Sequence, residues 1–155
     1  MSIWKYANPQ LFMSWTGKAL PYIATLAVIT TMTGLIWGFF FTGDDYRMGS
    51  TVKIIYIHVP SAMMAINAWI MMLIASLIWL VRRHHVSALA AKAAAPIGLI
   101  MTVVALATGA IWGKPMWGAY WAWDPRLTSF LILFLFYVGY MALWEAVENS
   151  DTAAD

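Results

Sequence analysis

The sequence predicts an all-α membrane protein with four transmembrane helices, and two observations support that prediction. The first is composition: the 155 residues are 63% hydrophobic and only 10% charged, whereas soluble domains carry about a quarter charged residues. The second is patterning, because four apolar stretches come close to or exceed the ~20 residues that cross a ~30 Å hydrocarbon core. The four spans are expected at about 21–41, 54–81, 93–111 and 126–147.

Composition also excludes several kinds of function. Without cysteine, the chain forms no disulfide and no thiolate metal site. The net charge of +2 is small and scattered, which argues against nucleic acid as a partner. No HExxH, GxSxG or Gly-rich phosphate loop occurs, so we do not expect an enzyme. Residues 1–20 lack a continuous apolar core, and we expect no cleavable signal there.

The first residues of the chain are expected to lie at the membrane surface, before the first span. Residues 1–20 mix aromatic side chains with lysine, which is typical of an interfacial segment; a loosely ordered tail is an equal alternative. A single membrane domain then covers 21–147, and Pro21 suits the first turn of its first helix. Pro60 is tolerated in a first turn and disfavours helix at the residue before it, so we expect His58 at the mouth of the second helix.

The second half begins with the densest basic cluster, Arg82 to Lys92. Such clusters favour the cytoplasmic side, and the N-terminus is therefore expected in the cytoplasm. Asp124 followed by Pro125 predicts the start of the fourth helix, as N-cap and first helical residue. A polar tail is expected at 148–155. The third span carries small residues that let membrane helices approach closely: Gly98, Ala105, Ala107, Gly109 and Ala110.

The most unusual stretch runs from Trp112 to Arg126, and we expect it as a loop between the third and fourth spans. Counting spans places this loop and His58 on the same face, and the basic cluster predicts that this face is the outer one. An interfacial belt accounts for tryptophans elsewhere, at Trp37, Trp69, Trp79 and Trp144. It does not account for four rings within one loop, which favour a flat conjugated ligand instead. These rings belong to Trp112, Trp117, Trp121 and Trp123.

Charged residues and one histidine complete the candidate site. Arg126 lies in a first helical turn, where the helix dipole disfavours cations, so we expect it to have an anionic partner. That partner is either Asp124 or lipid phosphate, or else a ligand carboxylate gripped by the planar guanidinium. Lys114 could assist. His58 offers the imidazole nitrogen that a metalloporphyrin iron requires, although a lone histidine at a helix end is more often an ordinary interfacial residue.

The stretch from Trp112 to Gly118, followed by Trp121, Trp123-Asp124 and Arg126-Leu127-Thr128-Ser129, resembles the tryptophan signature of the CcmC family of haem exporter proteins in cytochrome c maturation. The segment from Ile54 to Pro60, containing His58, resembles the family's first histidine site. The similarity covers the chain from about Pro21 to Trp144. Tyr120 and Phe130 depart from the pattern, where tryptophan and an acidic residue are common.

The resemblance implies binding of haem b at the outer face of the bacterial inner membrane and its presentation to the haem chaperone CcmE. The ATP-binding-cassette subunits CcmA and CcmB, the small helper CcmD and membrane lipid would be further partners. His58 would be an axial ligand of the haem iron, and the four tryptophans with Asp124 would form the haem platform. Family members have about six spans and a second axial histidine, so we expect this chain to be a fragment.

Two rival functions remain open at this point. One is a b-type haem or quinone-reactive electron-transfer subunit, but such proteins bury paired histidines within their spans, and here no histidine lies mid-span. The other is a scaffold that only organises partners. The position of Arg126 and the glycine-spaced rings argue against the scaffold.

Overall fold

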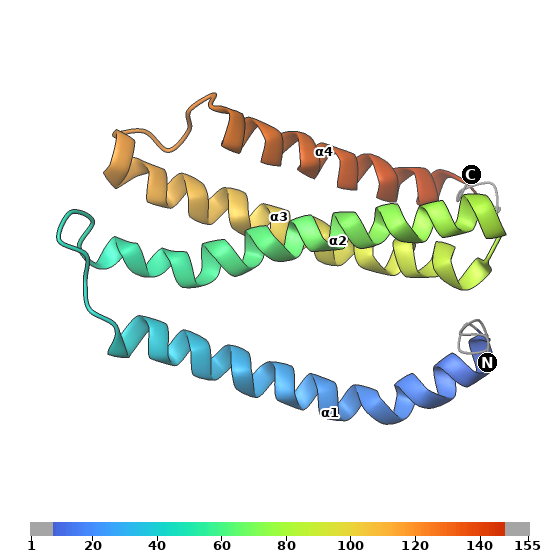
Figure 1. Ribbon diagram of the computed structural model, residues 1–155. Coiled ribbons are helices and arrows are strands. Elements are labelled where there is room, and N and C mark those ends of the chain that lie inside the picture. The colour runs from blue at the N-terminus through green and yellow to red at the C-terminus, as the bar shows by residue number, and fades with distance from the viewer. Residues whose placement is uncertain (1–7, 148–155) are drawn as a thin grey trace. The chain divides into compact units, whose positions relative to one another are not determined.

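The computed structural model describes residues 8–147, and these residues form four long helices without a named strand (Figure 1). The helices are α1 (Pro9–Ile36), α2 (Ile55–Arg82), α3 (His85–Trp117) and α4 (Pro125–Ala146). A π-helical turn, Trp37–Phe41, follows α1, and a 3₁₀ turn, Ser50–Ile54, precedes α2. Each helical segment is long and apolar enough to cross a membrane, which confirms the predicted fold class. The expected polar tail lies outside the described residues.

Helix α1 belongs to a first compact unit that ends at Thr42. It begins well before the expected first span, because Asn8 is its N-cap and Pro9 its first residue. The Asn8 side chain accepts hydrogen bonds from the backbone N–H groups of Gln10 and Leu11, at 2.9 and 3.3 Å. Pro21 therefore lies inside the helix and not in its first turn. Much of the segment expected at the interface is thus the first part of a long helix, while residues 1–7 lie outside the described part.

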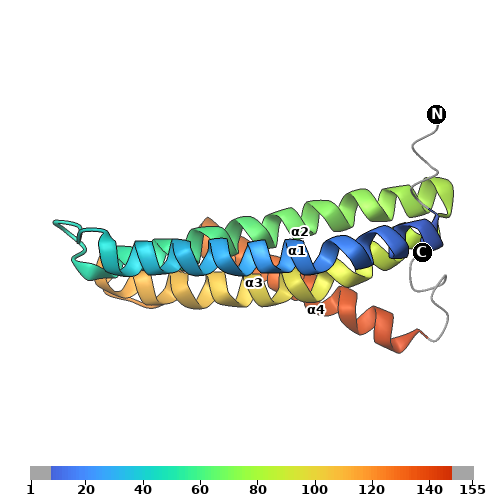
Figure 2. The ribbon, with the colours of Figure 1, turned by 90° about the horizontal axis from the view of Figure 1, so that it is seen from below.

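Helices α2 and α3 form an antiparallel hairpin in the second unit, which starts at Gly43. Figures 1 and 2 both show these two helices side by side. Along α2 the buried residues recur every three or four positions, which is heptad spacing. Most are small, so the two backbones approach closely. Gly98, Ala105 and Gly109 of α3 are buried as expected, but Ala107 is exposed. The buried α2 residues are Ser61, Ala65, Ala68, Met72, Ala75 and Trp79.

Helix α4 packs on this hairpin around the buried Tyr137. The Tyr137 side chain is fully buried, and its hydroxyl donates a hydrogen bond of 2.7 Å to the Ala65 carbonyl of α2. Its ring lies directly over Gly98 of α3, where a Cβ atom would come within 2.2 Å. Trp69 of α2 meets the same ring edge-on, with centroids 5.3 Å apart. Three helices therefore meet around Tyr137.

One end of the second unit contains the turn between α2 and α3, closed by Arg83 in a left-handed conformation (φ 48°). Two of the tryptophans expected in an interfacial belt do not face outward. Trp79 and Trp144 keep only 2% and 7% of their surface exposed, so they are packed inside the bundle. The Lys92 ammonium lies 4.6 Å from the Trp144 ring centroid, a cation–π contact.

The opposite end of the second unit contains the start of α2, the end of α3 and the start of α4 (Figure 1). His58 is in the first turn of α2, as predicted, whereas Pro60 lies one turn inside the helix. The expected loop from 112 to 126 is helical as far as Trp117, because α3 continues through Pro115 and ends at Gly118 (φ 76°). Only the segment 118–124 connects α3 to α4.

Candidate functional site

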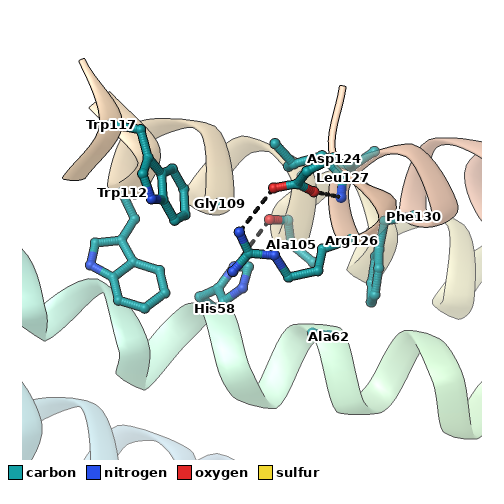
Figure 3. A pocket seen from close by; sticks show the side chains of 11 residues that line it. His58, Ala62, Ala105, Gly109, Trp112, Trp117, Asp124, Arg126, Leu127 and Phe130 are labelled. Atoms are coloured by element: carbon teal, nitrogen blue, oxygen red, sulfur yellow. Dashed lines mark hydrogen bonds and ion pairs between the residues drawn. The ribbon is translucent and has the colours of Figure 1, made fainter. Parts of the chain in front are cut away.

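A cavity of about 230 Å³ opens at this end between α2, α3 and α4 (Figure 3). It brings together five of the eight residues that the sequence singled out: His58, Trp112, Trp117, Asp124 and Arg126. Its wall is mostly apolar, with the polar groups confined to the histidine and the acid–base pair. The remaining lining residues are Ala62, Ala105, Leu106, Gly109, Leu127 and Phe130.

His58 reaches the cavity from α2 and is held against α3. Its Nδ1 atom lies 3.1 Å from the Ala105 carbonyl oxygen and 3.0 Å from the Thr108 hydroxyl oxygen. Gly109 makes this approach possible, because a Cβ atom there would lie only 3.1 Å from the imidazole Cε1. The Trp112 ring is the nearest aromatic neighbour, with its centroid 6.1 Å from that of His58. The imidazole ring of His58 is therefore held along one edge.

Trp112 and Trp117 lie on the last two turns of α3. The Trp112 indole N–H donates a hydrogen bond of 3.3 Å to the Met48 sulfur, which ties the loop before α2 to α3. Trp117 lies beneath the Arg126 guanidinium, whose carbon is 5.0 Å from the ring centroid. The two indoles therefore have different partners and line the cavity together with His58 (Figure 3).

Asp124 and Arg126 form the polar rim where α4 begins. One Asp124 carboxylate oxygen accepts the Leu127 backbone N–H at 2.9 Å, which confirms the predicted N-cap. The other oxygen accepts from Arg126 at 2.9 Å. The Leu127 amide is the main reason that the pKa of Asp124 lies below its usual value; the guanidinium acts in the same direction, and desolvation opposes both. Of the partners left open for Arg126, the structure supplies Asp124.

Even so, Arg126 stays available to a further anion. Its side chain is 71% exposed, and one ion pair uses only part of the five-donor guanidinium. The cation–π contact with Trp117 holds the guanidinium at the cavity, which both residues line. The site therefore combines an imidazole, two indoles and an oriented cation around an apolar cavity.

Three predicted site residues do not line this cavity. Lys114 closes the end of α3, with its ammonium donating to the Gly118 carbonyl at 2.9 Å. The Trp121 and Trp123 rings pack edge to face, with centroids 5.3 Å apart. Trp123 is 76% exposed, and the Trp121 indole N–H is buried without a hydrogen-bond partner within residues 8–147. Lys114 lies in the last turn of α3, and Trp121 and Trp123 lie in the segment that connects α3 to α4.

Several lining residues were not singled out from the sequence as site residues. Ala62 follows His58 by one helical turn, and Ala105 and Gly109 stand one turn apart on α3. All three are small residues at helical spacing, a pattern that for Ala105 and Gly109 predicts close helix packing. Small residues opposite a histidine also leave room for a ligand.

The metal-ligating side chains limit the kind of metal site that this part of the chain can form. Within residues 8–147, no group of three His, Cys, Asp or Glu side chains converges on a common point. Among the lining residues, His58 alone has a side-chain nitrogen that can ligate a metal, because the indole and guanidinium nitrogens are donors only. This arrangement suits a metal that is already held by an organic ligand and needs only an axial bond.

Comparison with known proteins relates the chain to one family. The model of the family described as Heme exporter protein C matches residues 2–155. A protein of that name from Rhodobacter capsulatus is 69% identical over the whole chain, and one from Paracoccus denitrificans is 70% identical. The Escherichia coli K12 protein is 44% identical over 88% of the chain. The chain covers 64% of the length of the first two relatives and 56% of the third.

Proposed function

This chain belongs to the haem exporter protein C family, and we propose that it binds haem b and presents it at the outer face of the bacterial inner membrane. The observation that carries the proposal is the joining of His58, Trp112, Trp117 and Arg126 in one cavity, from three different helices. Together these four residues offer the three features that suit haem: a nitrogen for iron, aromatic surface for the macrocycle and a cation for its propionates.

The size of the cavity defines which part of haem it would take. Pockets for whole small molecules measure about 300–1,000 Å³, whereas this one is about 230 Å³. It would therefore hold one edge and one face of the macrocycle. The other face would be left for groups outside this chain's described residues, in keeping with relatives of greater length.

Each residue has a separate task in this proposal. His58 would supply the axial nitrogen, and Trp112 and Trp117 would exclude water from the macrocycle edge. Arg126, oriented by Asp124, would pair with a propionate in a charge-assisted hydrogen bond. The exposed Trp123, beside Trp121, offers an aromatic surface next to the cavity. Lys114, at the end of α3, adds positive charge to the same rim.

The partners follow from the direction of transfer. We propose that bound haem passes to the periplasmic chaperone CcmE, and that the CcmA and CcmB subunits and the helper CcmD act in the same assembly. The basic end of the α2–α3 hairpin would face the cytoplasm, and the cavity would then open on the periplasmic side of the membrane. The protein would then handle and present haem without catalysing bond chemistry in its own right.

The placement of the histidines favours haem handling over membrane electron transfer. An electron-transfer subunit holds haem between two histidines that face each other inside the membrane. Here His58 is at one end of α2, whereas His84 and His85 precede and begin α3 at the opposite end. These are the only histidines in the sequence.

The test is haem binding by the purified chain in detergent, followed by absorption spectroscopy. His58→Ala should lose the bound haem, and His84→Ala, at the other end of the bundle, should keep it. Unchanged haem content in His58→Ala would refute the proposal.

A second comparison tests the propionate assignment. Arg126→Ala should weaken binding of haem about tenfold or more, because it removes a charge-assisted hydrogen bond. It should leave binding of haem dimethyl ester unchanged, because the esterified propionates carry no charge. Equal losses for both porphyrins would exclude Arg126 as the propionate partner.

A further inference from the structure

The hydrogen bonds of His58 constrain which of its nitrogens carries the proton. Nδ1 faces two oxygens, the Ala105 carbonyl at 3.1 Å and the Thr108 hydroxyl at 3.0 Å. A carbonyl oxygen can only accept, so a bond to Ala105 requires a proton on Nδ1. An unprotonated Nδ1 would instead hold its lone pair against the carbonyl lone pairs.

The Thr108 hydroxyl is arranged to accept as well. Its proton has another acceptor, because Oγ1 donates 2.7 Å to the Val104 carbonyl of the preceding turn. Its lone pairs are then free to receive the imidazole N–H. Both oxygens therefore favour the same tautomer.

Gly109 completes the arrangement by fixing which edge of the ring faces α3. A Cβ atom at this position would be 3.1 Å from Cε1 and 3.6 Å from Nδ1 of His58. The Nδ1–Cε1 edge is therefore packed against the glycine backbone. Nε2 makes no hydrogen bond to any of residues 8–147 and is the nitrogen left for a ligand in the cavity.

We propose that Thr108, together with the Ala105 carbonyl, is a positioning group that holds His58 in the Nδ1–H tautomer and so presents the Nε2 lone pair to the haem iron. A hydrogen bond from the ring nitrogen that does not bind the metal makes the imidazole a stronger electron-pair donor to the metal and fixes the orientation of the ring. This inference rests on the proposed haem function for its consequence, but the tautomer itself is a property of the haem-free protein.

The first experiment needs no haem. Nitrogen-15 NMR of histidine-labelled protein in micelles at alkaline pH distinguishes a protonated from an unprotonated ring nitrogen, and the signals of His58 are those lost in His58→Ala. We expect a protonated Nδ1 and an unprotonated Nε2. The opposite pattern, or an equal mixture of tautomers, would overturn the proposal even if haem binds normally.

The second experiment uses three threonine variants. Thr108→Val removes the hydroxyl with little change in shape, and Thr108→Ser keeps it. Thr102→Val is the matched control, because the Thr102 hydroxyl makes the same backward bond on α3, 2.7 Å to the Gly98 carbonyl, and no contact with a histidine. Circular dichroism establishes that each variant is folded.

Thr108→Val should bind haem about tenfold more weakly, as is usual when a partner of a metal ligand is lost. Its iron–histidine stretching band in resonance Raman spectra should move to lower frequency, because the imidazole becomes a weaker donor. Thr108→Ser and Thr102→Val should match the wild type in both measurements. A wild-type band in Thr108→Val would refute the positioning role, and so would equal affinity losses in both valine variants. If the wild type binds no haem, the proposed function fails and the NMR result alone decides the tautomer.

Discussion

Gly98→Ala is expected to destabilise the bundle, although alanine is the better helix former. The new Cβ atom would lie 2.2 Å from the Tyr137 ring and hydroxyl, and Tyr137 has no free space to move into because it is fully buried. Overpacking of this kind costs ~3 kcal/mol, and displacing Tyr137 also weakens its hydrogen bond to Ala65, worth ~0.6 kcal/mol, against ~1 kcal/mol gained in helix propensity. We therefore expect a net loss of about 2–3 kcal/mol.

The assay is reversible unfolding in mixed micelles with increasing SDS, followed by tryptophan fluorescence. Trp69 packs against Tyr137 and makes the signal sensitive to this contact. Gly139→Ala on α4 is the control, because a Cβ atom there meets nothing within 4 Å, and it should be neutral or slightly stabilising. Gly98→Ala should cost little in a Tyr137→Leu background. Wild-type stability of the single Gly98→Ala variant would contradict the reasoning.

Three further predictions concern the ends of the helices. The pKa of Asp124 is lower in the folded protein than in the unfolded chain, where it lies near 3.8. The stability that Asp124 contributes is therefore present above the unfolded pKa and is lost as the pH falls through the lower folded pKa. In unfolding curves measured at different pH, Asp124→Asn should reduce this loss of stability at acid pH. Lys92→Met removes the cation over Trp144 and should cost about 0.5–1 kcal/mol in the SDS assay; no change would exclude a net contribution. Trp112→Phe removes the N–H bonded to Met48 and should speed hydrogen exchange in loop 43–49 while α3 amides stay protected.

The association of His58 with the tryptophan stretch could be predicted because it depends on the number of spans and not on their boundaries. Helices that begin or end several residues away from their expected positions still place successive loops at alternating ends. In the structure, His58, Trp112 and Trp117 line the same cavity. Which end faces the periplasm stays a prediction based on basic residues.

Boundaries and burial were less accessible from the sequence. The fall in hydropathy at Lys114 predicts that the third span ends before it. Gly118, with a lysine one turn earlier, is however a recognised helix C-terminal signal. Trp79 and Trp144 match an interfacial belt in sequence position, and only the packing of three helices shows that they face inward. The contacts of Thr108 and Gly109 with His58 depend on how α2 crosses α3, which no single-helix pattern encodes.

The lengths of α3 and α4 define the depth of the cavity in the membrane. The charge-free stretch of α3 between Lys92 and Lys114 is about 32 Å long at ~1.5 Å per residue, close to the ~30 Å hydrocarbon thickness. On α4 the stretch between Arg126 and Glu145 is slightly shorter, about 27 Å. Lys114 and Arg126 therefore mark the same boundary, and Trp112 and Trp117 fall within a turn of it. The lining of the cavity reaches down α3 to Ala105, about 13 Å below Lys114 at ~1.5 Å per residue. A ligand in the cavity would therefore extend from the headgroup layer into the hydrocarbon, within reach of molecules dissolved in lipid on one side and of proteins in water on the other.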